Sequence, residues 1–298
     1  MPKKKPGVQP AAAIAVPEPA ESSPEASRLP WMVSFCVLSA LLTALIWWPV
    51  ARIPAQFTET INEGFSVYFQ DIAAHGGRIY GAPPQYFWAT YPPVSYHLVG
   101  WLGLVLHDIN VAGRIVAFLS YLAIGMLAAL IVRQLTGEWR YGALAAFCWL
   151  IWLAALDPVR VQLNDPHMLG VALGFTGLYC FLRDPESDRW LRISGVVFAV
   201  SLFTKHSLIA IPLVVGLHLL LTSRRRLLNW MLPAAATCVV LLVLTIVVDG
   251  PYFIDHLSHG PSGRPQQHHD QRAHPLLPGA GPSAQRVVSE RPIRTQSR

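Results

Sequence analysis

Long apolar segments alternate with short polar connections over most of this chain. The first apolar segment, residues 31–50, is long enough to cross a bilayer, because an α-helix rises about 1.5 Å per residue and the hydrocarbon layer is about 30 Å thick. Further spans are predicted at residues 113–132, 141–156, 168–182, 191–204, 207–221 and 228–248. The pattern therefore predicts an all-α integral membrane protein with about seven transmembrane helices in residues 30–250.

One further apolar segment, residues 94–106, could either cross the membrane or lie along its surface. The lysines near the amino terminus and the later basic connections share one side of the membrane only if this segment does not cross. Lys and Arg are enriched in cytoplasmic loops, so we predict an interfacial helix at residues 94–106. The same argument predicts a multi-pass protein of the cell membrane whose amino terminus is cytoplasmic.

With this topology, residues 52–113 become one large first extracytoplasmic loop of about 60 residues, whereas connections usually have about 4–6. Loops of that length are usually functional or disordered, and this one is too rich in Phe and Tyr to be disordered. Asp165, Lys205 and Asp249 are predicted to lie on the same side of the membrane. The convergence of these charges with the long loop predicts a functional site at that face.

Composition agrees with a membrane protein. The chain has 298 residues, of which 53% are hydrophobic and 13% are charged, whereas soluble domains carry about 25% charged residues. The net charge is +6, but the basic residues flank apolar segments, as membrane topology requires. We therefore expect a lipid bilayer and no nucleic acid as partner. The four cysteines lie in different apolar segments without a CxxC pair, which argues against zinc sites and disulfides.

The two ends of the chain differ from the middle. Residues 1–29 are rich in Pro, Ala and Ser, and they predict a disordered cytoplasmic leader. Residues 251–298 likewise predict a disordered tail. A change of reading frame near residue 255 would explain the abrupt change in composition, and the membrane domain would then be truncated at its carboxyl end.

The first loop contains a candidate catalytic acid. Glu59 and Glu63 are four residues apart, so they share one face of a predicted surface helix that Thr58 or Thr60 would cap. A carboxylate at the edge between membrane and water can have a raised pKa and act as a general base, which makes Glu63 a candidate. The alternative is a solvated helix face, which the spacing alone favours.

Two isolated charges outside the loop are also candidates. Asp165 precedes Pro166 at the start of a predicted span, where it would stabilise the helix, orient a base or bind a cation. Lys205 lies between two apolar segments. Such a lysine is costly in a membrane and often marks an anion site, for which a lipid phosphate is the natural ligand. The residues predict no metal site or other cofactor, although a divalent cation stays open.

Five short motifs follow one another over residues 29–248. They are NEGFSVY (62–68), YPPVSYHLVG (91–100), AGR (112–114), NDPHMLG (164–170) and FTKHSLIAIPL (203–213). With these motifs the chain resembles polyprenyl-phosphate-sugar-dependent glycosyltransferases of the GT-C fold. It is similar in particular to the dolichyl-phosphate-mannose protein mannosyltransferase-like proteins of family 39 and to the lipid A aminoarabinose transferases. The resemblance implies a seven-span module with juxtamembrane helices in the first loop.

The resemblance also implies roles for individual residues. An acidic pair of the family reads Asn62-Glu63 here, so Glu63 would be the base that activates the acceptor, with Asp165 near the site. Lys205 would hold the donor phosphate. Sugar or acceptor contacts would come from Tyr68, Tyr91 and Tyr96, although aromatic residues at such positions more often anchor a protein at the membrane interface.

The implied reaction transfers a sugar from a polyprenyl-phosphate donor to a lipid, glycan or protein acceptor, by direct displacement with inversion. Two alternatives stay open. A truncated descendant of such an enzyme would be an inactive membrane scaffold. A transporter is less favoured, because it should show broken polar spans or internal repeats with charges at the midplane.

Overall fold

The computed structural model describes residues 28–82 and 87–258, and every regular element in these residues is a helix. The longer helices are α1 (Arg28–Arg52), α4 (Ile109–Thr136), α5 (Trp139–Leu156), α6 (Pro166–Arg183), α7 (Asp188–Thr204) and α9 (Arg224–Leu244). The shorter elements are α2 (Ile61–Ala74), α3 (Val94–Leu106), α8 (Ala210–Thr222), the π-helical turn η1 (Thr245–Asp249) and α10 (Phe253–Ser258).

Four helices of the described part are long and apolar enough to cross a membrane: α1, α4, α5, and α9 continued by η1. Many of their large apolar side chains are exposed, as expected for helices whose solvent is lipid. A helix is present at each of the seven predicted spans. The chain is consistent with an integral membrane protein, whereas the number of seven spans and their sidedness stay predictions.

Local sequence signals explain where several of these helices begin and end. The Asp108 side chain accepts a hydrogen bond from the Val111 N–H at 2.9 Å and caps α4, while Gly137, with φ of 77°, ends it. Asp165 caps α6 through the His167 N–H at 2.7 Å, and Pro166 occupies the first helical turn. These are the residue types that favour helix termini, because they satisfy backbone groups that the helix leaves unpaired.

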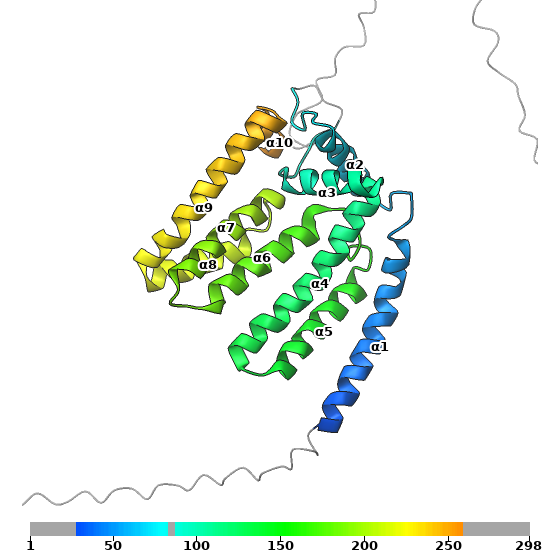
Figure 1. Cartoon of the computed structure of the whole chain (residues 1–298), viewed down its shortest axis with the longest axis vertical. Helices are drawn as coiled ribbons and strands as arrows, with labels where there is room; N and C mark the ends of the chain where they lie inside the picture. Colours follow the sequence, from blue (N-terminus) through cyan, green and yellow to red (C-terminus); the bar gives the residue numbers. More distant parts are fainter. Residues whose placement is uncertain (1–27, 83–86, 259–298) are drawn as a thin grey trace, which may run out of the picture. The chain divides into compact units, whose positions relative to one another are not determined.

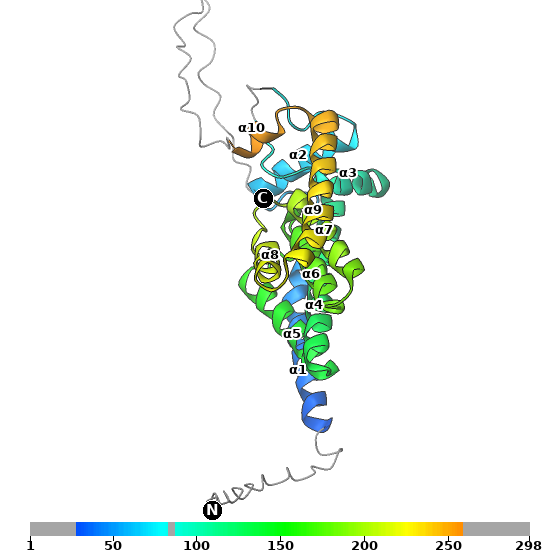
Figure 2. The same ribbon diagram turned by 90° about the vertical axis from the view of Figure 1, so that its left-hand side faces the viewer.

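The two helices of the predicted first loop, α2 and α3, lie crosswise at one end of the long helices (Figure 1 and Figure 2). This is the orientation that the prediction of an interfacial helix at residues 94–106 requires. α3 packs closely on α2 because Gly100 has no side chain: a Cβ there would lie 2.4 Å from the Gln70 carbonyl oxygen.

An aromatic core holds the loop together. Phe69, Tyr80, Tyr96 and Phe253 are each 3% exposed or less, and the Tyr80 and Phe253 rings are 4.9 Å apart. Phe253 belongs to α10, which lies in the predicted disordered tail. The predicted tail therefore starts too early, because α10 buries aromatic surface against the first loop. The rest of the predicted leader and tail, residues 1–27 and 259–298, lies outside the described residues.

His256 of α10 is also buried and forms two backbone hydrogen bonds with the loop. Its Nδ1 accepts a hydrogen bond from the Ala89 N–H at 3.2 Å, and its Nε2 donates one to the Gly81 carbonyl at 3.1 Å. Both bonds are made by the neutral ring. Burial lowers the pKa of His256, although these two bonds and Asp255 oppose the shift. The neutral imidazole therefore ties α10 to the loop.

This tie predicts that mild acid weakens the protein. Below the ordinary histidine pKa of about 6.5, the unfolded chain takes up a proton that the folded chain resists, so the free energy of unfolding falls as the pH drops. We expect His256→Gln to destabilise the chain by about 1–3 kcal/mol at pH 7.5 and to reduce its extra loss at pH 5.5. Thermal unfolding of the purified protein in detergent measures both. An unchanged pH dependence in the variant would contradict this assignment.

Candidate functional site

Glu63 lies in the first turn of α2, whose N-terminus is capped by the Thr60 hydroxyl at 3.2 Å from the Glu63 N–H. The side chain is fully buried, at 0% exposure. The alternative of a solvated helix face is therefore wrong, whereas the position of Glu63 at the edge between membrane and water stays a prediction. The physical reason is a counter-charge from another helix, which removes the need for water around the carboxylate.

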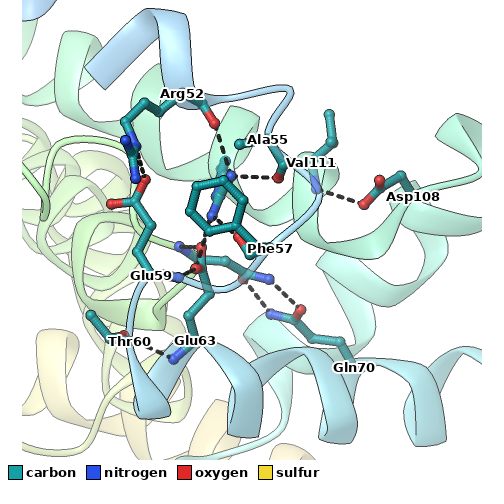
Figure 3. Close-up of polar contacts among 11 residues, drawn as sticks. Arg52, Ala55, Phe57, Glu59, Thr60, Glu63, Gln70, Asp108 and Val111 are labelled. Carbon is teal, nitrogen blue, oxygen red and sulfur yellow. Dashed lines mark hydrogen bonds and ion pairs between the residues drawn. The ribbon is translucent and has the colours of Figure 1, made fainter. Parts of the chain in front are cut away.

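That counter-charge is Arg114, one turn into α4 and also 0% exposed. Its Nε and Nη2 donate to the two Glu63 carboxylate oxygens at 2.8 and 2.9 Å (Figure 3). The other three N–H groups of the guanidinium donate to loop carbonyls, those of Arg52, Ala55 and Phe57, at 2.7–2.8 Å. All five donors are thus satisfied, which a buried guanidinium requires.

Glu63 accepts two more hydrogen bonds from backbone groups. They come from the Glu59 N–H at 2.6 Å and the Asn164 N–H at 3.3 Å. With four bonds the carboxylate has filled the sites that two oxygens offer. In this arrangement Glu63 joins α2, α4 and the segment before α6, and it would have to exchange one of these bonds in order to accept a proton from a substrate.

Asn164 strengthens the same junction. Its side-chain amide and that of Gln70 exchange two hydrogen bonds, at 2.7 and 2.8 Å. The pair fits because Gly113 leaves room on α4: a Cβ there would lie 2.0 Å from Asn164 side-chain atoms. Three of the five sequence motifs, NEGFSVY, AGR and NDPHMLG, therefore meet in one buried polar network.

Glu59 and Asp71, two other acids of the first loop, pair with residues other than Arg114. Glu59 pairs with Arg52 at 2.7 Å. Asp71 is exposed and lies 3.3 Å from His75. The predicted helix face shared by Glu59 and Glu63 is therefore wrong, because α2 begins at Ile61 and Glu59 precedes it.

A second polar cluster forms around Asp165, the residue that follows Asn164. Lys205, at the end of α7, places its Nζ 3.1 Å from the Asp165 carboxylate and 4.5 Å from the centre of the Tyr91 ring. The Lys205 and Asp165 side chains are 12% and 6% exposed. The Asp165 carboxylate also interacts with the Tyr91 side chain. The structure thus brings together three of the predicted site residues.

Charged groups of both signs surround Tyr91 in this cluster. Burial and the Asp165 carboxylate raise the pKa of Tyr91 to about 12, against the opposing charge of Arg160, so the phenol remains a hydrogen-bond donor at neutral pH. Arg160 itself pairs with Asp157 at 2.6 Å. Two cations and two carboxylates therefore lie around Tyr91.

The remaining predicted contacts are differently placed. Tyr68 is 47% exposed and its ring lies against Phe69 and Phe87, so it is accessible to a ligand. Tyr96 is 2% exposed and belongs to the aromatic core, with its ring 5.6 Å from that of Phe69. Among the described residues, no three His, Cys, Asp or Glu side chains form a group that could hold a metal ion.

Two pairs of interacting residues were not predicted from the sequence: Glu63 with Arg114, and His97 with Asp249. Arg114 is a charge one turn into a 28-residue apolar helix, a signal that by itself indicates a buried partner or a functional site. The second pair is His97 with Asp249, whose Nε2 and Oδ1 atoms are 2.8 Å apart across 152 residues of sequence. Asp249 was expected on the same face, but no local spacing relates it to His97.

The comparison with protein families decides the class of protein. Glycosyltransferase family 87 matches residues 89–272, which is more than half of the chain. The chain belongs to glycosyltransferase family 87. No protein of curated function and no solved structure matches it significantly.

Membership of family 87, together with the apolar helices, supports a membrane glycosyltransferase. A glycosyltransferase acts on a sugar donor and an acceptor, and the helices imply a bilayer around it. The matched region includes Tyr91, Asp165 and Lys205, while Glu63 precedes it. The narrower resemblance to family 39 and to the aminoarabinose transferases stays a prediction.

The buried ion pair yields a stability prediction. Arg114→Ala leaves the Glu63 charge without its partner in a dry site, so we expect a loss of about 3–5 kcal/mol in the free energy of unfolding. The half-exposed pair of Arg160 and Asp157 is the control: Arg160→Ala should cost less than about 1 kcal/mol. Glu63→Gln combined with Arg114→Met should recover part of the loss.

Chemical or thermal unfolding of the purified chain in detergent measures these differences. Equal effects of Arg114→Ala and Arg160→Ala would show that the buried pair does not hold the loop on the helices.

Proposed function

We propose that the chain transfers a sugar from a polyprenyl-phosphate donor to an acceptor at the extracytoplasmic face of the cell membrane, by inverting displacement. Family membership supports the transfer of a sugar. The lipid-phosphate donor and the inversion rest on the sequence resemblance. The observation that supports the location of the site is the convergence of Asp165, Lys205 and Tyr91.

In this proposal Lys205 holds the donor phosphate and stabilises the charge that develops on it as the sugar departs. Tyr91 adds a neutral donor beside the same lysine, and Asp165 orients both. Lys205 would bind the phosphate while it keeps its ion pair with Asp165, so its side chain would not have to move when the donor binds.

Glu63 is proposed as the base that takes the proton of the acceptor hydroxyl. The carboxylate already accepts four hydrogen bonds, so an acceptor hydroxyl must displace one of them. The bond from the Asn164 N–H is the longest, at 3.3 Å, and is the one that we expect to be displaced. A specific observation favours the alternative of a scaffold: the same saturation by Arg114 and two backbone groups explains Glu63 without any reaction.

The proposed membrane topology has its own test. In a chain without its four native cysteines, Arg78→Cys before α3 and His107→Cys after it should both react with an impermeant thiol reagent added from outside. Arg140→Cys, in the first turn of α5, should react only after the membrane is opened. All three native residues are exposed. Labelling of His107→Cys from the cytoplasmic side would mean that α3 crosses the bilayer.

The reaction is tested by transfer from a radiolabelled polyprenyl-phosphate sugar in membranes that contain the full chain. We expect Lys205→Met to lower transfer at least about a hundredfold, because a cation that stabilises transition-state charge is removed. Asp165→Asn keeps the helix cap and should lower transfer by removing one charge. Arg78→Met removes an exposed cation at the same end and should leave transfer unchanged.

Glu63→Gln separates the two readings of the buried acid. Abolished transfer by a protein that still folds and binds donor supports the base. Transfer that persists in Glu63→Gln contradicts the base and leaves Glu63 a structural residue. Absence of transfer from the wild-type chain under conditions where the donor binds favours the scaffold.

A further inference from the structure

A polar pocket lies where the segment between α1 and α2, the flank of α2 and the turn from α3 to α4 meet. Its volume is about 550 Å³, within the range of about 300–1,000 Å³ that is usual for ligand sites. Gln56 and Thr58 line it from the segment before α2, and Asp108 and Asn110 line it from the start of α4. Val67 of α2 adds an apolar wall.

Asn110 has polar atoms that the fold does not use. The residue is buried, at 8% exposure, and within the described residues neither its amide oxygen nor its amide nitrogen has a hydrogen-bond partner. A buried polar group without a partner costs stability, so it is uncommon in folded proteins and calls for an explanation. Because Asn110 lines the pocket, a bound molecule would supply the partner for both atoms.

Further polar groups at the pocket are available to a ligand. Thr58 and Thr60 were both candidate caps of α2, and the structure shows that Thr60 caps it. The Thr58 hydroxyl is therefore not needed by the helix, and Thr58 and Gln56 are both exposed. Asp108 uses its Oδ1 atom to cap α4, and its Oδ2 atom can accept a hydrogen bond from a ligand.

The buried pair of Glu63 and Arg114 keeps this pocket in shape. Arg114 follows Asn110 by one turn of α4. Its guanidinium donates to the carbonyl of Phe57 at 2.8 Å, and Phe57 lies between two residues that line the pocket. The walls from α4 and from the segment before α2 are therefore tied together before a ligand arrives. A site that needs no rearrangement loses less free energy on binding.

The chemistry of these groups favours a neutral sugar. Amide and hydroxyl side chains can both donate and accept hydrogen bonds, as the hydroxyl groups of a sugar do. No Lys or Arg is among the lining residues in the described part of the chain, and the Asp108 carboxylate would repel an anion. Val67, Leu104 and Ile109 offer apolar surface to the C–H groups of a sugar ring.

We propose that this pocket binds one sugar unit of a neutral glycan, apart from the groups that carry out the proposed transfer. Tyr91 precedes the first residue of α3, Val94, whereas Leu104, near the other end of this helix, lines the pocket. Ten residues of helix extend about 15 Å, so a single sugar ring does not span the two places. The inference rests on the proposed function and deepens it, because it makes the acceptor a glycan of more than one sugar unit.

The test is binding of three fluorescent neutral trisaccharides, built of mannose, glucose or galactose, to the purified full chain in detergent at pH 8. We expect at least one of them to bind. Asn110→Leu removes both polar atoms and Leu104→Trp narrows the pocket, and each should weaken binding at least about tenfold. Thr58→Val removes one hydroxyl and should weaken binding about threefold. Gln134→Leu, at an exposed amide near the far end of α4, is the control and should change binding less than about twofold.

Thermal unfolding of the same variants separates a binding role from a structural one. Asn110→Leu removes an amide that has no partner within the described residues, so it should leave Tm unchanged or raise it. Weaker binding that comes with a clear fall in Tm would show that Asn110 holds the fold, and it would overturn the proposal. Failure of all three trisaccharides to bind would also overturn it. So would equal binding of an anionic trisaccharide of galacturonic acid, whose carboxylates meet no Lys or Arg among the described lining residues.

Sugar transfer measured on the same variants distinguishes this inference from the proposed function. Binding with the expected pattern but without sugar transfer supports the pocket and contradicts the enzyme. Sugar transfer to a neutral glycan that Asn110→Leu and Thr58→Val leave unchanged supports the enzyme and contradicts the pocket.

Discussion

The pair of Glu63 and Arg114 holds the first loop on the helical bundle. Removal of two charges from water costs several kcal/mol for each ion, so the pair is tolerable because all five guanidinium donors and both carboxylate oxygens are occupied. Three of these bonds go to carbonyls of residues 52–57. The network therefore determines where the chain leaves α1, where α2 begins and how α2 lies across α4.

The candidate site is joined to this buried network by one peptide bond, between Asn164 and Asp165. Asn164 contacts Glu63 and exchanges two hydrogen bonds with Gln70, while the next residue, Asp165, turns to Lys205 and Tyr91. The buried network thus positions the cluster of Lys205, Asp165 and Tyr91. Substitutions of Arg114, Gln70 or Asn164 should therefore act on the proposed sugar transfer through the position of this cluster, without contact with the substrate.

The same end of the molecule combines two kinds of surface. Lys205, Tyr91 and Asp165 provide charge and hydrogen-bond donors, and a groove lined by α3, Phe203 and the α9–η1 segment provides apolar walls within two residues of Lys205 and of Tyr91. A lipid-linked sugar has the same division between an apolar chain and a charged head. The crosswise helices α2 and α3 place the two surfaces side by side, and α10 with His256 closes the loop from the carboxyl end.

Hydrophobic runs and the bias of Lys and Arg were enough to predict the long apolar helices and the separate helix at residues 94–106, because helix formation and membrane insertion depend on local composition. They missed α10, which was expected to be part of a disordered tail. They also identified Lys205 and Asp165 as unusual charges in apolar surroundings. They did not predict that Glu63 meets Arg114, 51 residues away, or that His97 meets Asp249, 152 residues away. Spacing within a helix says which residues share a face, whereas the burial of that face depends on what packs against it, and only the tertiary structure decided that.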